Sequence, residues 1–232
     1  MRAFCKSFSH LVFAAVVAAL ASSGSASAVE VTINSATMTN GFMNVFELDN
    51  TFVFPSGWGV ADLSATFPDS TTVNFKPCFV NDTSSFWYTP SGEPGAAGNK
   101  NMEANLYAQE TDTLSGQTVD FKGVVSDFTL LSGWTFKAFV RDFAPDYSSF
   151  NESVFPITGT GEFSVSLATI PLPGRHVQYG LQMYGPNVWV TDVASKGSVT
   201  VTAVPEPSTL AILAAGLALV PAARKRLARR RA

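Results

Sequence analysis

Cysteine and histidine are scarce in this sequence, whose 232 residues include two of each. Cys5 and His10 stand near the N-terminus, so the chain beyond them holds Cys78 and His176 alone. One cysteine cannot form an intramolecular disulfide, and one cysteine with one histidine cannot supply the usual zinc ligand sets. We therefore expect Cys78 to be a small, buried apolar side chain.

The common catalytic motifs are also absent. The sequence contains no Gly-x-Ser-x-Gly, no P-loop, no dinucleotide-binding fingerprint and no His-Glu-x-x-His. A serine triad would have to use His176, whose place in an alternating segment indicates a surface side chain. A glycoside hydrolase needs two carboxylates, but the acidic residues are too numerous to single out a pair. We expect no enzyme activity and keep a glycoside hydrolase as the distant alternative.

Positive charge is rare between residues 30 and 203. This segment has 17 acidic and 7 basic side chains, which leaves a net charge of −10. An acidic surface repels phosphates, so the charge argues against a nucleic-acid partner. It is compatible with neutral sugars, with cations or with solubility alone.

Amphipathic helical periodicity is lacking in this segment too. Apolar and polar residues alternate there in short runs that Gly and Pro separate, which is typical of β-strands. The expected strands are residues 29–33, 43–48, 60–67, 72–75, 86–89, 102–109, 119–126, 134–141, 163–167, 177–183 and 199–203.

About ten to twelve short strands without crossover helices favour an antiparallel sheet arrangement. We therefore predict an all-β fold for residues 29–203, an antiparallel β-sandwich of jelly-roll type. Glycine, proline and other turn-forming residues predict loops at residues 90–101, 143–150 and 171–175.

The N-terminus is typical of a secretory signal peptide. Arg2 and Lys6 precede an apolar run at residues 11–21, and the small residues Ala26-Ser27-Ala28 follow. The apolar run is short for a membrane span, which disfavours an uncleaved anchor. We predict a signal peptide over residues 1–28, with a helix at its apolar run and cleavage before Val29.

The C-terminus has three parts in a fixed order. Pro205-Glu206-Pro207 come first, residues 210–223 contain no charged side chain, and residues 224–231 contain six basic ones. An apolar run before a basic cluster predicts a transmembrane helix whose basic end stays in the cytoplasm. A plain membrane anchor is the alternative for this segment.

These three parts, over residues 204–232, resemble the PEP-CTERM sorting domain. The resemblance implies secretory export, transient anchoring in the cytoplasmic membrane, and recognition by an exosortase-type enzyme that processes the chain near Pro205, Glu206 and Pro207. It also implies a Gram-negative bacterium that makes exopolysaccharide, with the mature protein at the outer surface or in an extracellular biofilm matrix. Release and attachment of the processed protein both stay open.

A second resemblance covers the later part of residues 29–203. Gly-Gln-Thr-Val-Asp-Phe-Lys-Gly at residues 116–123, residues 134–142, Gly-Glu-Phe-Ser-Val at residues 161–165, and residues 177–181 look like the second half of carbohydrate-binding jelly-roll modules. The resemblance implies that fold, and it carries over no particular sugar contact.

Aromatic side chains in or beside the loops are candidates for carbohydrate binding. Trp87 and Tyr88 lie next to the loop at residues 90–101, and Tyr147 lies within the loop at residues 143–150. Aromatic rings can stack on the apolar faces of sugar rings, and binding residues tend to lie on loops. The expected partner is extracellular polysaccharide. If these rings pack in the core instead, the protein is a structural matrix or coat protein without a sugar site.

No cofactor is expected, and a structural calcium ion stays open. Calcium prefers oxygen ligands, but the sequence contains no Asp-x-Asp-x-Asp-Gly loop that would place an ion. The candidate ligands by residue type are Asp49, Asp62, Asp69, Asp82, Asp142, Asp146 and Asp192.

Overall fold

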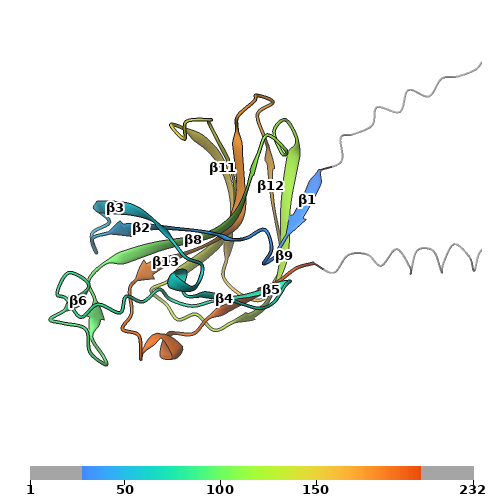
Figure 1. The fold of residues 1–232 in the computed structure, drawn as a ribbon. Coiled ribbons are helices and arrows are strands. Elements are labelled where there is room, and N and C mark those ends of the chain that lie inside the picture. Colours follow the sequence, from blue (N-terminus) through green and yellow to red (C-terminus); the bar gives the residue numbers. More distant parts are fainter. Residues whose placement is uncertain (1–27, 205–232) are drawn as a thin grey trace, which may run out of the picture.

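The computed structural model describes residues 28–204, which form two large β-sheets and a small two-stranded one (Figure 1). Two 3-10 turns, η1 (Ala61–Leu63) and η2 (Val193–Lys196), interrupt the strands. In chain order the strands are β1 (Val29–Thr32), β2 (Asn40–Phe46), β3 (Phe52–Trp58), β4 (Ala65–Asp69), β5 (Thr72–Phe75), β6 (Tyr88–Thr89), β7 (Ala97–Gly98), β8 (Asn101–Thr111), β9 (Thr118–Phe128), β10 (Thr135–Phe143), β11 (Phe150–Ile157), β12 (Gly161–Ala168), β13 (His176–Pro186) and β14 (Val199–Thr202).

The two terminal helices predicted from the sequence lie outside the described residues. Within residues 28–204, no helix is both long and apolar enough to cross a membrane.

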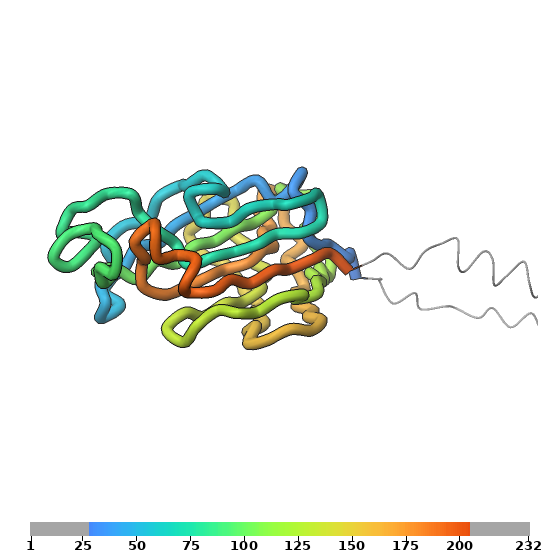
Figure 2. The backbone as a smooth tube through the Cα atoms, turned by 90° about the horizontal axis from the view of Figure 1, so that it is seen from below, coloured from blue at the N-terminus to red at the C-terminus, as the bar shows by residue number. Residues whose placement is uncertain are grey.

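The first sheet has the strand order β1–β9–β14–β5–β4, and β12 pairs with the other edge of β9. Because β12 covers residues 118–125 of β9, both β1 and β14 must share the remaining edge. β1 is parallel to β9, whereas the other pairs of this sheet are antiparallel. The amide of Val204 lies 3.3 Å from Oγ1 of Thr32, so the last described residue returns to the first strand (Figure 2).

The second sheet is antiparallel throughout, with the order β11–β10–β13–β8–β2–β3. Its central strands β13 and β8 each have 11 residues. The sheet coils strongly, so that β11 stands steeply against β2 and β3 (Figure 1).

The two sheets pack face to face around one continuous hydrophobic core. The ring of Phe75 from the first sheet lies 5.6 Å from that of Phe136 in the second, and the rings of Phe121 and Tyr179 are separated by the same distance. Side chains from both inner faces therefore fill a shared layer, as a β-sandwich requires. The prediction of an all-β sandwich is confirmed.

Several segments differ from the expected strands and loops. Residues 60–67 are a 3-10 turn followed by β4, because Ser64 adopts a left-handed conformation with φ of 60° between the two. β3 and β11 are strands that the sequence patterns do not indicate. The expected loop at residues 90–101 contains the two residues of β7, which pair with β6.

A buried ion pair fixes the connection at residues 171–175 to the sandwich. Asp142 on β10 is fully buried, and its carboxylate accepts hydrogen bonds from Nε of Arg175 at 2.6 Å and from the amide of Ile170 at 2.7 Å. Nη2 of Arg175 also donates to the carbonyl oxygen of Asp142 at 2.8 Å. The buried charges are thus paired and well bonded, as burial requires.

Arg175→Ala should lower the free energy of unfolding by about 3–5 kcal/mol, because the change leaves the Asp142 carboxylate buried without its cation. Urea denaturation followed by fluorescence measures this. Lys122→Ala is the control, since Lys122 pairs with Glu30 and Asp120 on a solvent-accessible surface, where an ion pair contributes little to stability. Its free energy of unfolding should fall much less than that of Arg175→Ala. Equal losses in the two variants would contradict this account of the ion pair.

Cys78 makes the free energy of unfolding depend on pH in alkaline solution. Burial raises the pKa of its thiol from the ordinary 9.0 to about 12. The unfolded chain therefore loses this proton first, and the associated stability is present below a pH of about 9 and declines as the pH rises toward about 12. The free energy of unfolding of Cys78→Ala, measured by urea titration across this range, should fall less steeply than that of the native protein. Parallel curves for the two proteins would refute this.

Candidate functional site

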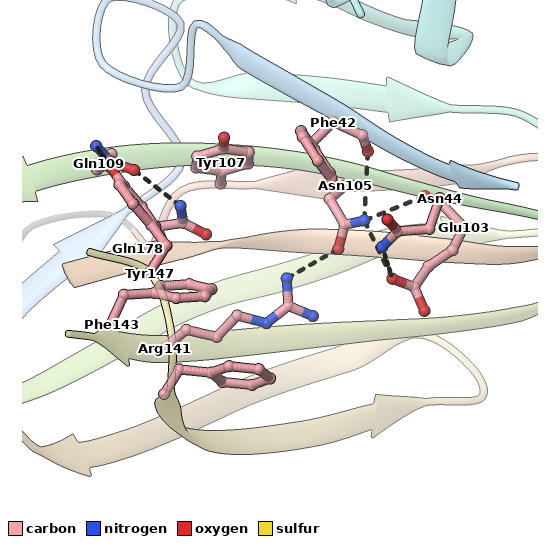
Figure 3. A pocket seen from close by; sticks show the side chains of 11 residues that line it. Phe42, Asn44, Glu103, Asn105, Tyr107, Gln109, Arg141, Phe143, Tyr147 and Gln178 are labelled. Carbon is pink, nitrogen blue, oxygen red and sulfur yellow. Dashed lines mark hydrogen bonds between the residues drawn. The ribbon is translucent and has the colours of Figure 1, made fainter. Parts of the chain in front are cut away.

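A depression of about 530 Å³ lies on the outer face of the second sheet (Figure 3). Strands β2, β8, β10, β11 and β13 and the turn between β10 and β11 supply its walls and floor. The lining residues are Phe42, Asn44, Glu103, Asn105, Tyr107, Gln109, Arg141, Phe143, Tyr147, Phe150 and Gln178.

Alternation along the strands explains why these side chains share one face. On β8, Met102, Ala104, Leu106 and Ala108 are buried in the core, so the intervening residues point to the other side of the sheet. Those intervening residues are Glu103, Asn105, Tyr107 and Gln109, and all four line the depression. β13 behaves in the same way, with Gln178 and Gln182 on the outer face.

Asn105 is the centre of the polar floor. Its Oδ1 accepts hydrogen bonds from Nη1 of Arg141 at 3.0 Å and from Nε2 of Gln182 at 2.7 Å. Its Nδ2 donates to the carbonyl oxygens of Phe42 and Glu103 at 3.3 and 3.1 Å. Asn105 is 2 % exposed, and these bonds satisfy a buried amide that would otherwise be costly. The floor is therefore held in one arrangement.

The charge of Arg141 is compensated from the side of β11. Its Nε donates to Oε1 of Glu152 at 2.6 Å, and its guanidinium lies 3.9 Å from the centre of the Phe139 ring. An ion pair combined with a cation–π contact holds the guanidinium flat on the sheet. Arg141 thus offers the depression a fixed donor rather than a free positive charge.

Tyr147 forms one end of the depression. It adopts a left-handed conformation with φ of 57° in the turn between β10 and β11. Its ring stacks on the imidazole of His176, with centroids 4.4 Å apart and planes 4° from parallel. Its hydroxyl accepts a hydrogen bond from Nε2 of Gln109 at 2.9 Å, and Gln109 in turn accepts one from Gln178 at 2.8 Å. Tyr147 is nevertheless 49 % exposed.

Several groups of the lining keep hydrogen-bonding capacity for a ligand. Within residues 28–204, the hydroxyl of Tyr107, Oε2 of Glu103 and the side-chain oxygens of Asn44 and Gln178 take part in no hydrogen bond. Oε1 of Glu103 accepts hydrogen bonds from Nδ2 of Asn44 at 2.8 Å and from Nδ2 of Asn105 at 3.4 Å. Burial, followed by the nearby Tyr147, raises the pKa of the Tyr107 hydroxyl, so it stays protonated at neutral pH. The site therefore presents a free donor and a free acceptor beside exposed rings.

The other two aromatic candidates lie away from this depression. Tyr88 is fully buried, and its hydroxyl lies within hydrogen-bond distance of the carbonyl oxygens of Val80 and Val188, at 2.6 and 2.9 Å. Trp87 is partly buried against the core, with its ring centre 4.7 Å from that of Phe86. The structure thus brings Tyr147 to the depression and places Trp87 and Tyr88 in the packing around β6.

The candidate calcium ligands are dispersed. In the part of the chain that the structure describes, no three His, Cys, Asp or Glu side chains gather as a metal site. Several of these carboxylates instead accept hydrogen bonds from backbone amides in turns, at Thr51 for Asp49, Thr71 for Asp69 and Ser148 for Asp146. These bonds lower the pKa of the Asp49 and Asp69 carboxyl groups. The hydroxyl of Ser148, followed by its amide, lowers the pKa of the Asp146 carboxyl group.

The prediction from the sequence misses most of the lining, because it rests on aromatic side chains in or beside loops. Asn105, Tyr107, Gln109 and Gln178 lie within long strands. A signal was present: the outward positions of residues 101–109 are amides, a carboxylate and a tyrosine, not the Thr and Lys common on solvated strand faces.

Comparison with known proteins finds a family match at the C-terminal end of the chain. No curated protein matches the chain, and no solved structure matches it. Residues 203–231 match the model of the PEP-CTERM protein-sorting motif, which agrees with the resemblance noted at residues 204–232. The chain is therefore an exported protein that carries the PEP-CTERM sorting motif and is sorted by an exosortase.

Proposed function

We propose that the exported sandwich binds extracellular polysaccharide without catalysis, through the depression on its second sheet. One observation carries this proposal: an exposed tyrosine ring, a free phenol hydroxyl and a free carboxylate oxygen lie together on a floor of bonded amides. Aromatic faces stack on the apolar faces of sugar rings, while amides and carboxylates bond the hydroxyls around the rings.

Charge favours a neutral glycan. The two basic side chains on this face, Lys137 and Arg141, both lie within ion-pair distance of Glu152, at 3.8 and 2.6 Å. The surrounding segment carries a net charge of −10, which would repel a strongly acidic chain. The site thus suits hydroxyl-rich sugars better than uronates or sulfated sugars.

The sorting motif supports an extracellular location for such binding. In this proposal the exosortase processes the chain near Pro205, Glu206 and Pro207 after transient anchoring in the cytoplasmic membrane. The sandwich then reaches the outer surface or the exopolysaccharide matrix of a Gram-negative biofilm. Binding to the matrix polysaccharide would retain the protein there without a covalent attachment.

A structural matrix or coat protein is the second candidate, and the edge strand β11 favours it. Phe150, Val154 and Phe155 on this strand are all exposed, at 51, 42 and 38 %. Exposed apolar side chains on an unpaired strand edge favour contact with another chain. Such assembly would require no sugar site.

A glycoside hydrolase is the third and most distant candidate. Hydrolysis of a glycosidic bond requires two carboxyl groups on opposite sides of the bond. Among the described side chains that line the depression, Glu103 is the one carboxylate. The Glu152 carboxylate is engaged by Arg141. The lining therefore supports binding better than hydrolysis.

Tyr147→Ala should weaken glycan binding roughly tenfold, because it removes the exposed ring at the end of the depression. A glycan array followed by calorimetry with the producing bacterium's exopolysaccharide would measure this. Phe155→Ala is the matched control, since Phe155 is comparably exposed but points to the other side of the sheet.

Saturable binding that Tyr147→Ala weakens and Phe155→Ala leaves unchanged would support the proposal. Binding that depends instead on Trp87 would move the site to the region around β6. A folded protein that binds no glycan would overturn the proposal and favour the structural role.

A further inference from the structure

A second group of aromatic rings lies on the same face of the second sheet, at the opposite end of its strands. The ring of Phe46 lies 5.6 Å from that of Phe52 and 6.0 Å from that of Tyr184, nearly perpendicular to both. We call these three residues the distal cluster. Phe52 is 54 % exposed, although none of the three lines the depression described above.

Strand periodicity places the distal cluster on the same face as the depression. Phe42 and Asn44 of β2 line the depression, and Phe46 is the next residue of that alternating series. On β13, Tyr184 continues the series of Gln178 and Gln182. Tyr184 pairs directly with Glu103 on β8, so the distal cluster begins where the polar floor ends.

The β2–β3 turn holds the distal cluster in place. Oδ1 of Asn50 accepts a hydrogen bond from the hydroxyl of Tyr184 and another from Nδ2 of Asn101 at 3.1 Å. The amide of Thr51 donates to Asp49 at 2.9 Å and closes the turn. The rings are thus set before any ligand binds, which reduces the entropy lost on binding.

The two aromatic ends are far apart for a small sugar. Tyr147 stacks on His176, the first residue of β13, and the distal cluster contains Tyr184, eight positions further along. An antiparallel strand rises about 3.4 Å per residue, so the two ends are separated by roughly 27 Å. That length corresponds to several sugar units of an extended chain, and Asn44, Glu103 and Gln182 occupy the face between them.

We infer that the depression and the distal cluster form one groove that binds the interior of an extended, neutral polysaccharide chain. The inference rests on the proposed function and specifies its ligand by length and charge. Rings at both ends stack on sugar faces, and the amide floor bonds the hydroxyls of the units between them. Because the contacts spread along the sheet, the groove recognises a stretch of chain rather than a chain terminus.

The probe is neutral exopolysaccharide from the producing bacterium, partly hydrolysed with acid and separated by length. Calorimetry with the exported protein should give a Kd that falls as fragments lengthen and becomes constant once they reach both ends. Phe52→Ala should weaken the binding of long fragments roughly five- to tenfold and leave short fragments unchanged. Tyr147→Ala should weaken both, and Phe155→Ala neither.

Equal affinity of short and long fragments, with no effect of Phe52→Ala, would overturn the inference while the proposed function stands. Tighter binding of uronate-rich fragments than of neutral ones would overturn its charge assignment. Binding of an extended peptide in preference to every glycan fragment would overturn both the inference and the proposed function. Phe52 is largely exposed, so its truncation leaves the core intact and a lost affinity reports on the groove.

Discussion

The register of β13 is the constraint on which both faces of the second sheet depend. β13 is bonded to β10 on one side and to β8 on the other along nearly its whole length. Val177 and Leu181 are fully buried between the sheets, while Gln178 and Gln182 face outward. A shift of one residue would put the amides into the core and the aliphatic side chains onto the outer face. The hydrophobic core therefore fixes the floor of the binding face, and no separate element is needed to position it.

The amides on that floor combine two properties that most side chains do not combine: they are buried on the sheet, and they are polar toward a ligand. Gln178, Gln182 and Asn105 are 6, 5 and 2 % exposed, so each must be hydrogen-bonded within the protein. Ionised groups so deeply placed would need counter-ions, as Arg141 needs Glu152. Neutral amides can bond each other and still match the alternating donors and acceptors of hydroxyl groups. A surface of this kind is rigid and selective for polar, uncharged ligands.

The sequence predicts the strands that have one apolar and one polar face. It misses strands whose two faces are similar in polarity. The expected strand at residues 72–75 has the observed bounds, and those at 102–109 and 177–183 lie inside β8 and β13. β3 contains Pro55 and Gly57 and lies at the edge of its sheet, where proline is tolerated because one side needs no ladder bonds. β11 is the opposite edge and is exposed on both faces, so it has no apolar alternation. Both strands are missed for one physical reason: these two edge strands bury too little to impose a pattern.

The binding face is harder to predict because it depends on which strands become neighbours. Arg141 and Asn105 are 36 positions apart, and Gln178 and Gln109 are 69 apart; alternation tells which way each points but not what it meets. Tyr147 could be proposed because a turn exposes its side chain whatever strand lies beside it. The same argument proposes Trp87 and Tyr88, yet Tyr88 is buried, with its hydroxyl beside the carbonyl oxygens of Val80 and Val188, which only folding brings near it. An aromatic residue beside a glycine- and proline-rich loop can therefore be exposed or buried, and the sequence does not tell which. Amides and a tyrosine at successive outward positions of one long strand, as in β8, are more informative. They indicate a hydrogen-bonded polar face, because solvation of a strand does not require these residue types.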